Sequence, residues 1–205
     1  MTSINPSIKT IVFDLGGVLI DWNPRYLYQK LFDDPQEMEY FLTHVCNQQW
    51  NLQQDAGRPF QQAVDNLIPQ HPQYSDFIKA YDQRWEEMLG QADQGTVALL
   101  EECKNSGIDI YALTNWSHEK FPIALQRYAF LSWFKGIVVS GEVKMKKPDL
   151  AIYQHLVKQY RIDTSTAVYI DDNFENAQAA EGVGMRGIHF QSAEQLQQEL
   201  IKQTG

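Results

Sequence analysis

Short apolar runs alternate with longer segments of helical spacing along most of this chain, and that alternation limits the fold more than any other feature. The runs are rich in β-branched and aromatic residues, which is typical of buried strands. They lie at residues 10–13, 108–113, 136–139 and 167–170, with a weaker run at 186–190. Strands that alternate with helices form βαβ units, so the sequence predicts an α/β fold with a doubly wound parallel sheet.

Helices are expected between and after these strands. Ser117 and the Pro148-Asp149 pair are typical helix starts, and Gly107 is a typical helix stop. The expected helices are residues 96–105, 117–128, 148–160, 173–183 and 193–203.

A stretch from about Trp22 to Gln91 interrupts the alternation. It is rich in Gln, Trp, Tyr and Phe, with helical spacing and no convincing strand. The expected helices here are residues 24–32, 35–46, 59–68 and 74–89. We therefore expect two domains. One is a Rossmann-like α/β core made of residues 1–20 and 92–205, and the other is a helical cap of residues 21–91, inserted after the first strand.

Composition excludes several classes of protein. Hydrophobic residues make up 43% of the 205 residues, which is enough for a sizeable core. The net charge of −9 disfavours nucleic acid as a partner. Two cysteines, Cys46 and Cys103, rule out a disulfide scaffold and favour a reducing compartment. No signal-peptide pattern or apolar run of about 20 residues is present, so we expect a cytoplasmic protein without a membrane partner.

Polar groups follow each of the main predicted strands. Ligands in open α/β sheets bind outside the carboxyl ends of the strands, and parallel strands bring these ends to one edge. Carboxylates, a hydroxyl, an amide and a lysine are therefore expected to meet there. The residues in question are Asp14, Thr114-Asn115, Asp171-Asp172 and the lysines of residues 144–147.

Such a set of groups suits phosphoryl transfer. Three carboxylates repel one another and need a cation, and oxygen ligands without His or Cys suit Mg²⁺. The metal would let the anionic Asp14 approach an anionic phosphate. Asp14 could then attack phosphorus and form an aspartyl-phosphate, which water hydrolyses. Thr114, Asn115 and a lysine could hold the phosphoryl oxygens.

At these residues the chain resembles the haloacid dehalogenase superfamily. Each motif alone is weak, but four in the right order, on the right elements and spread over essentially the whole chain, are specific. The motifs are Val12-Phe13-Asp14-Leu15-Gly16-Gly17-Val18, Leu113-Thr114-Asn115, Lys147-Pro148-Asp149 with Ile152-Tyr153, and Tyr169-Ile170-Asp171-Asp172-Asn173 with Asn176. The helical insert looks like the family's cap, which closes over the site and selects the substrate.

The resemblance implies a role for each matching residue. Asp14 would be the nucleophile and a metal ligand, and Gly16 would contact the metal through its carbonyl oxygen. Asp172 would be the main further ligand, with Asp171 beside it as an indirect or water-mediated partner. Lys147 would be the catalytic lysine of the motif.

The second motif implies the phosphate contacts. Thr114 and Asn115 would bind phosphate, and Trp116, which follows them, is a candidate contact to the substrate. The function that results is a Mg²⁺-dependent phosphatase for a small phosphorylated metabolite such as a sugar phosphate. We expect a monomer or a weak homodimer.

One position departs from the family's pattern. Its phosphatases usually carry a second Asp two residues after the nucleophile, as general acid and base, whereas this chain has Gly16 there. General acid–base catalysis is typically worth about 10²–10⁴-fold in rate. Some phosphatases of this subgroup share the glycine. Asp21 could substitute as the acid, or it could cap a helix.

Two other functions are compatible with the same fold. A metal-independent 2-haloacid dehalogenase would attack carbon with the same aspartate, but the adjacent Asp171 and Asp172 would repel its carboxylate substrate. A catalytically weak binding or regulatory protein could also keep the fold. A phosphomutase is disfavoured, because Gly16 cannot provide the acid–base help that such an enzyme needs.

Overall fold

A five-stranded parallel sheet forms the centre of the computed structural model, which describes residues 4–201 of the chain. The strands lie in the order β5-β4-β1-β6-β7, and every neighbouring pair is parallel. Their bounds are β1 Thr10–Phe13, β4 Asp109–Thr114, β5 Gly136–Val139, β6 Ala167–Asp171 and β7 Arg186–His189. The predicted α/β fold and its parallel sheet are confirmed.

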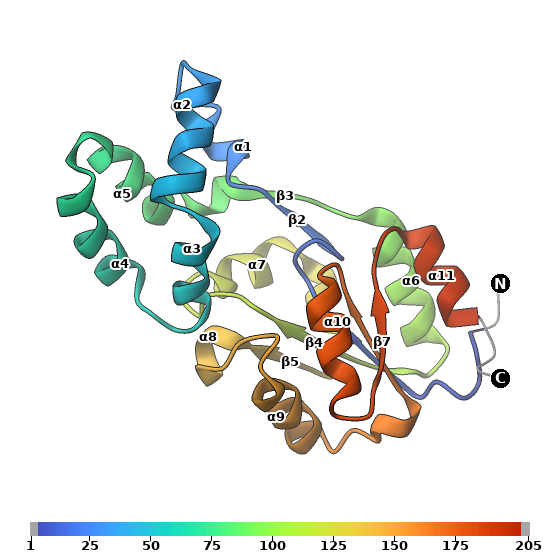
Figure 1. The fold of residues 1–205 in the computed structure, drawn as a ribbon. Coiled ribbons are helices and arrows are strands. Elements are labelled where there is room, and N and C mark those ends of the chain that lie inside the picture. The colour runs from blue at the N-terminus through green and yellow to red at the C-terminus, as the bar shows by residue number, and fades with distance from the viewer. Residues whose placement is uncertain (1–3, 202–205) are drawn as a thin grey trace.

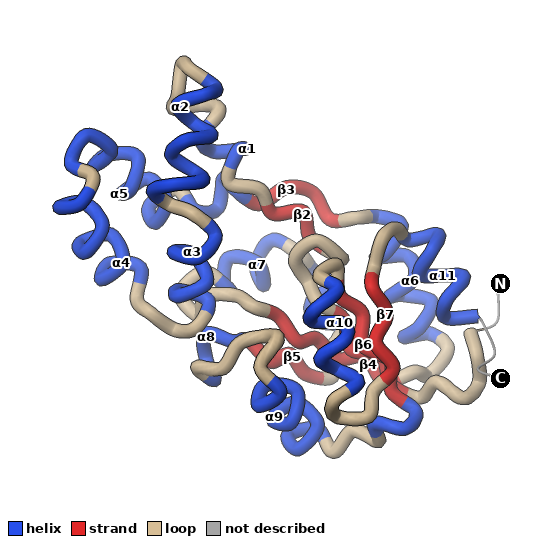
Figure 2. Tube along the Cα trace, in the orientation of Figure 1, coloured by secondary structure: helices blue, strands red, loops and turns tan. Residues whose placement is uncertain are grey.

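Helices cover both faces of this sheet (Figures 1 and 2). Successive side chains of a strand point to opposite faces. Ile11 and Phe13 accordingly belong to one buried cluster and Val12 to the other. The first cluster includes side chains of α6 (Gln94–Asn105), α7 (Phe121–Arg127) and α11 (Ala193–Ile201). The second includes α9 (Leu150–Tyr160) and α10 (Phe174–Glu181).

Asx side chains at helix starts explain why several helices begin where they do. Asp93 caps α6 by accepting a hydrogen bond from the backbone N–H of Thr96 at 2.6 Å. Asn173 caps α10 by accepting from Glu175 and Asn176. A cap of this kind contributes about 1 kcal/mol to helix stability. Within residues 4–201, no helix has both the length and the apolar character that crossing a bilayer requires.

A group of helices is inserted between two short antiparallel strands, β2 (Ile20–Trp22) and β3 (Leu89–Ala92). In Figure 1 these helices stand together to one side of the sheet, joined to it by the β2–β3 pair. We call them the inserted helices: α1 Arg25–Tyr28, α2 Pro35–Tyr40 with the π-helical turn Phe41–Val45, α3 Gln48–Asp55, α4 Phe60–Leu67 and α5 Ser75–Gln83.

Aromatic side chains make the inserted helices a packed unit. The ring of Tyr28 lies 4.9 Å from that of Phe41, and Trp50 meets Tyr81 edge-on at 5.0 Å. Aromatic pairs at these distances stabilise a fold beyond the area that they bury. The aromatic richness of this stretch is thus explained by its own core.

The inserted region differs from the sequence prediction in several places. The β2–β3 pair was not predicted, because each strand is short and its partner lies far along the chain. Helix α3 was also missed, since its sequence is rich in Gln and only Trp50 and Gln54 are buried. The predicted helix 74–89 ends at Gln83, after which a 3₁₀ turn, Trp85–Met88, leads into β3.

Other helix bounds also shift by a few residues. The helix predicted to start at Ser117 begins at Phe121, and the helix predicted from Pro24 to Phe32 ends at Tyr28. Helix α8, Ser140–Val143, was not predicted. The last two residues of the predicted helix 193–203 lie outside the described residues. The division into domains at residues 20 and 91 stays a prediction.

Candidate active site

The carboxyl ends of three adjacent strands bring the predicted site residues together. Strand β1 lies between β4 and β6 in the sheet. Asp14 follows β1, Thr114 ends β4 and Asp171 ends β6. These side chains therefore start side by side at one edge of the sheet. Asp172 follows directly and lies beside them.

Lys147 joins two of these strands through its ammonium group. Its Nζ lies 2.9 Å from Asp14 Oδ2 and 2.7 Å from Asp171 Oδ2. The side chain is almost fully buried. Burial opposes the charge of the ammonium group, but the carboxylates of Asp14 and Asp171 outweigh it and raise the pKa of Lys147. The site thus contains a buried lysine whose positive charge is stabilised by two carboxylates.

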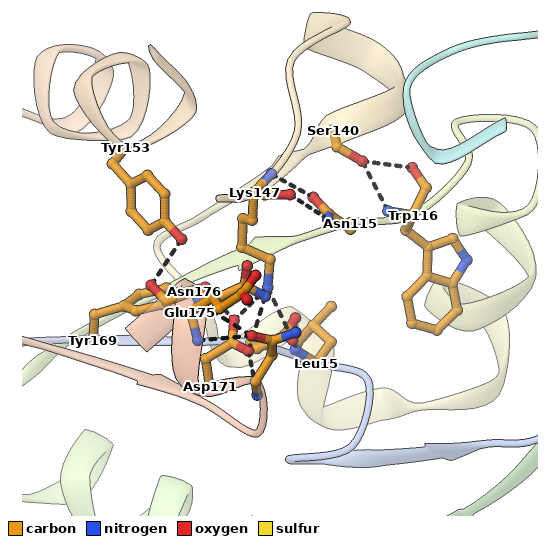
Figure 3. Close-up of polar contacts among 12 residues, drawn as sticks. Leu15, Asn115, Trp116, Ser140, Lys147, Tyr153, Tyr169, Asp171, Glu175 and Asn176 are labelled. Atoms are coloured by element: carbon orange, nitrogen blue, oxygen red, sulfur yellow. Dashed lines mark hydrogen bonds and ion pairs between the residues drawn. The ribbon is translucent and has the colours of Figure 1, made fainter. Parts of the chain in front are cut away.

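Asp171 is held by donors on both of its oxygens (Figure 3). Oδ2 accepts from Lys147 Nζ and, at 2.6 Å, from the hydroxyl of Tyr169. Oδ1 accepts from the backbone N–H of Asn173 at 2.9 Å and from Asn176 Nδ2 at 3.1 Å. With four donors and no solvent exposure, this carboxylate is suited to fix Lys147 rather than to bind a metal directly.

The surroundings of the Asp14 carboxyl group oppose its ionisation. The backbone N–H of Leu15 donates to its Oδ1 at 2.7 Å, and Lys147 faces its Oδ2. Burial raises the pKa of Asp14 to about 7, assisted by the charges of Asp171 and Asp172, while Lys147 acts in the opposite direction. Burial is thus the main reason why the ionised form of Asp14 is disfavoured in the absence of a further cation.

The residues present fit a hard divalent cation. Oxygen atoms of Asp14, Asp171 and Asp172 lie within 4.8 Å of one another. Desolvation and the neighbouring Asp171 also raise the pKa of Asp172, so this carboxylate too would gain from a nearby cation. Ligands that are all oxygens suit Mg²⁺. Since the oxygens of Asp171 already have donors, Asp14 and Asp172 are the better candidates for direct ligands.

The loop after β1 leaves just enough room for Asp172. Gly17 has a φ of +73°, and a Cβ atom there would lie 2.2 Å from Asp172 Oδ2. Gly17 therefore allows both the turn of the backbone and the approach of the carboxylate. Gly16, in contrast, has open space where its Cβ would be.

The predicted phosphate-binding residues lie at the end of β4. Thr114 is buried there. The side-chain amide of Asn115 pairs with the main chain of Lys147: Nδ2 donates to the Lys147 carbonyl at 3.1 Å, and Oδ1 accepts from its N–H at 2.9 Å. Asn115 therefore positions the lysine loop in this structure, in addition to facing the cavity described next.

A cavity of about 620 Å³ lies between this edge of the sheet and the inserted helices. Pockets of this size accept small organic molecules. Its wall mixes apolar and polar side chains. The apolar and aromatic ones are Trp22, Pro24, Leu42, Cys46, Leu52, Tyr81, Trp85 and Trp116, and the polar ones are Asn23, Arg25, Thr43, Gln48, Asn51, Asp55 and Asn115. Trp116 also packs on Trp85, with ring centroids 5.6 Å apart. Trp116 thus packs against a neighbouring ring and also lines the cavity, where a contact to the substrate stays a prediction.

Sequence reasoning missed two polar residues of the site and left one alternative open. Tyr169 reads as an ordinary strand residue, and Asp55 lies at the end of a helix that was not predicted. Asp21 is exposed, accepts a hydrogen bond from the hydroxyl of Tyr26, and lies in a different hollow that includes Asp93. It does not line the main cavity.

Comparison with known proteins agrees with this geometry. The family described as haloacid dehalogenase-like hydrolase matches residues 8–184. The chain is 31% identical over 186 residues to the sesquiterpene phosphatase astK of Aspergillus oryzae, with 90% of each chain covered. It is also 31% identical over 200 residues to the drimenol cyclase drtB of Aspergillus calidoustus. That match covers 97% of this chain but only 37% of the larger relative.

Solved structures support the fold. A HAD family enzyme of Bacteroides thetaiotaomicron, in complex with magnesium and inorganic phosphate, aligns with a TM-score of 0.65 at 22% identity, covering 87% of this chain and 92% of that one. A dehalogenase with an intermediate complex aligns with a TM-score of 0.72 at 17% identity, covering 98% and 100%. Fold similarity alone therefore does not separate these two chemistries, which leaves the side chains of the site to do so.

Proposed function

Because this chain belongs to the haloacid dehalogenase-like hydrolases, we propose that it is a phosphatase that cleaves a small phosphate monoester through an aspartyl-phosphate on Asp14. The observation that carries the proposal is the arrangement of Lys147 between Asp14 and Asp171, with Asp172 at the same edge. A buried carboxylate, a buried cation and a set of further oxygen ligands suit attack on a phosphoryl group.

Each residue has a defined task in this mechanism. Asp14 attacks phosphorus, and the N–H of Leu15 holds its carboxyl group in one orientation. Lys147 neutralises negative charge on the phosphoryl oxygens and stays in place because Asp171 and the amide of Asn115 hold it. Asp14, Asp172 and the carbonyl of Gly16 would hold Mg²⁺, which would supply the positive charge that lets two anions meet.

The acidic edge favours a phosphatase over the hydrolysis of a carbon–halogen bond. Asp171 and Asp172 lie beside Asp14, so three carboxylates share the single ammonium group of Lys147. A reaction without a metal would leave this charge to repel a carboxylate substrate. A reaction with a divalent cation uses the same charge as a binding site.

The cavity favours a substrate with an apolar organic part. Trp22, Trp85 and Trp116 line it together with Leu42 and Leu52, and polar side chains such as Asn23, Gln48 and Asn51 line the rest. One relative with 31% identity is named a sesquiterpene phosphatase. We therefore place terpenyl monophosphates ahead of sugar phosphates as the substrate class, with the inserted helices as the cap that selects between them.

A phosphate-release assay tests the proposal. The panel contains p-nitrophenyl phosphate, a sesquiterpenyl monophosphate and a hexose phosphate, each with Mg²⁺ and with EDTA. We expect Mg²⁺-dependent release that Asp14→Asn abolishes, with the sesquiterpenyl ester preferred. Asp33→Asn makes the same change at an exposed position and should leave the rate unchanged. Release that survives in Asp14→Asn, or no release by folded wild type, would contradict the proposed function.

A further inference from the structure

The position two residues after the nucleophile lacks a proton donor. Gly16 has no side chain, and a Cβ atom there would meet nothing within 4 Å, so this part of the cavity wall is open. An alkyl phosphate needs a proton on its bridging oxygen when the P–O bond breaks, because an alkoxide is a poor leaving group. The proton must come from another group that faces the cavity.

Four titratable side chains line the cavity in the described part of the chain: Arg25, Cys46, Asp55 and Tyr81. The Arg25 guanidinium is paired with Glu39, which raises its pKa further. Burial raises the pKa of Cys46, and it raises the pKa of Tyr81 well above the ordinary value. These three groups keep their protons throughout the neutral range. Asp55 is the one that can both give and take a proton there.

The structure holds Asp55 firmly against the core. It is the last residue of α3, and its backbone carbonyl accepts a hydrogen bond of 2.5 Å from Ser140 Oγ. Ser140 Oγ in turn accepts from the backbone N–H of Trp116, next to Asn115. Asn51 Nδ2 donates to Asp55 Oδ2 at 3.2 Å. The contact to Ser140 uses the backbone, so replacing the side chain of Asp55 leaves it in place.

The surroundings of Asp55 bring the pKa of its carboxyl group close to neutral pH. Burial raises the pKa of this carboxyl group to about 7, while the main chain of Ser117 and the charges of Lys146 and Lys147 limit the rise. Tyr81 of α5 faces it as a neutral phenol. A general acid works best when its pKa lies near the working pH.

We propose that Asp55, supplied by the inserted helix α3, is the general acid and base that replaces the side chain missing at Gly16. The inference rests on the proposed phosphatase function. Protonated Asp55 gives its proton to the bridging oxygen as Asp14 bonds to phosphorus and the alcohol leaves. The Asp55 carboxylate then takes a proton from the water that attacks phosphorus. The bond to Asp14 breaks, phosphate leaves and both carboxyl groups return to their first state.

Leaving-group dependence separates proton donation from a structural role. In Asp55→Asn, we expect kcat/KM for an alkyl monophosphate to fall by about 10²–10⁴-fold, the usual contribution of a general acid. For p-nitrophenyl phosphate it should change only a few-fold, since p-nitrophenolate leaves without a proton. kcat/KM reports the steps up to release of the alcohol, so it isolates the donation step. Asp65→Asn, on the exposed side of α4, is the matched control.

The pH profile gives a second readout. For the alkyl ester, wild-type kcat/KM should fall above about pH 7, as Asp55 loses its proton. This decline should be absent in Asp55→Asn and for p-nitrophenyl phosphate. Asp55→Glu keeps an acid at this place and should recover part of the activity toward the alkyl ester.

The outcomes separate this inference from the proposed function. Equal losses for both esters in Asp55→Asn, or an unchanged decline above pH 7, would show that Asp55 only supports the fold, while the phosphatase function would stand. If wild type releases phosphate from neither ester, the proposed function fails, and the inference fails with it.

Discussion

Two neighbouring aspartates have different surroundings at the end of one strand. Asp171 is fully buried, and four donors occupy its oxygens. Asp172, one residue later, is exposed and lies against Gly17. Successive side chains of an extended chain point in opposite directions, so the two carboxylates can have different roles. Asp171 orients Lys147, and Asp172 remains available to a cation.

Gly17 makes this division possible, and its replacement should disturb it. Gly17→Ala puts a Cβ atom at a φ of +73° and 2.2 Å from Asp172 Oδ2. We expect a loss of about 1–3 kcal/mol in the free energy of unfolding, which is the usual cost of such strain. Magnesium affinity should also fall, because Asp172 must move. Urea unfolding and titration calorimetry with Mg²⁺ measure the two effects.

Gly16→Ala is the matched control for this change. It adds the same methyl group one residue earlier, where nothing lies within 4 Å and the φ is not positive. Stability should stay within about 0.5 kcal/mol of wild type, as for most changes away from packed features. Wild-type magnesium affinity in Gly17→Ala would mean that Asp172 is not the carboxylate that the cation needs.

At the scale of elements, a side chain from the loop before α7 caps one of the inserted helices and thereby links these helices to the rest of the fold. Helix α4 begins after Pro59 without a side-chain cap of its own. Instead, Glu119 Oε2, in the loop before α7, accepts from the backbone N–H of Phe60 at 2.8 Å. A carboxylate at a helix N-terminus satisfies an otherwise unpaired donor and interacts well with the helix dipole.

Removing this carboxylate should weaken the contact between the inserted helices and the rest of the fold. Glu119→Ala is expected to lower the free energy of unfolding by about 1 kcal/mol, the typical value of a lost N-cap. Urea unfolding measures this, with Glu101→Ala on the exposed side of α6 as the control. Glu119→Gln keeps an acceptor oxygen and should recover part of the loss. Equal stability of Glu119→Ala and the control would mean that water replaces the contact.

Local patterns predicted the sheet, because its strands are apolar runs that end in polar residues. The same logic predicted that Asp14, Asp171 and Asp172 would meet, since parallel strands bring their carboxyl ends to one edge. The β2–β3 pair and the place of Asp55 depend on contacts between distant segments. Asp55 follows a Gln-rich stretch without apolar periodicity, so no local signal pointed to it.

At the scale of the whole molecule, charge decides what the site needs. The chain carries a net charge of −9, and a phosphate monoester is itself an anion. The site adds three carboxylates against the single ammonium group of Lys147. An anionic substrate therefore meets a repulsive field unless a local cation reverses it. A divalent cation at this edge would change both the binding of an anionic substrate and the stability of the folded protein.

Magnesium should stabilise the folded protein, and a proton should compete with it. At about 100 times its dissociation constant, a bound ion adds about 2.7 kcal/mol, which corresponds to roughly 5–10 °C in Tm for a chain of this size. Asp172→Ala should abolish the rise, and Asp33→Ala should keep it.

The pKa of Asp14 is raised to about 7 without a cation, so Mg²⁺ affinity should weaken as the pH falls from 8 to 6. Thermal unfolding with Mg²⁺ at several pH values tests this, and a rise in Tm that persists in Asp172→Ala would place the cation away from this edge.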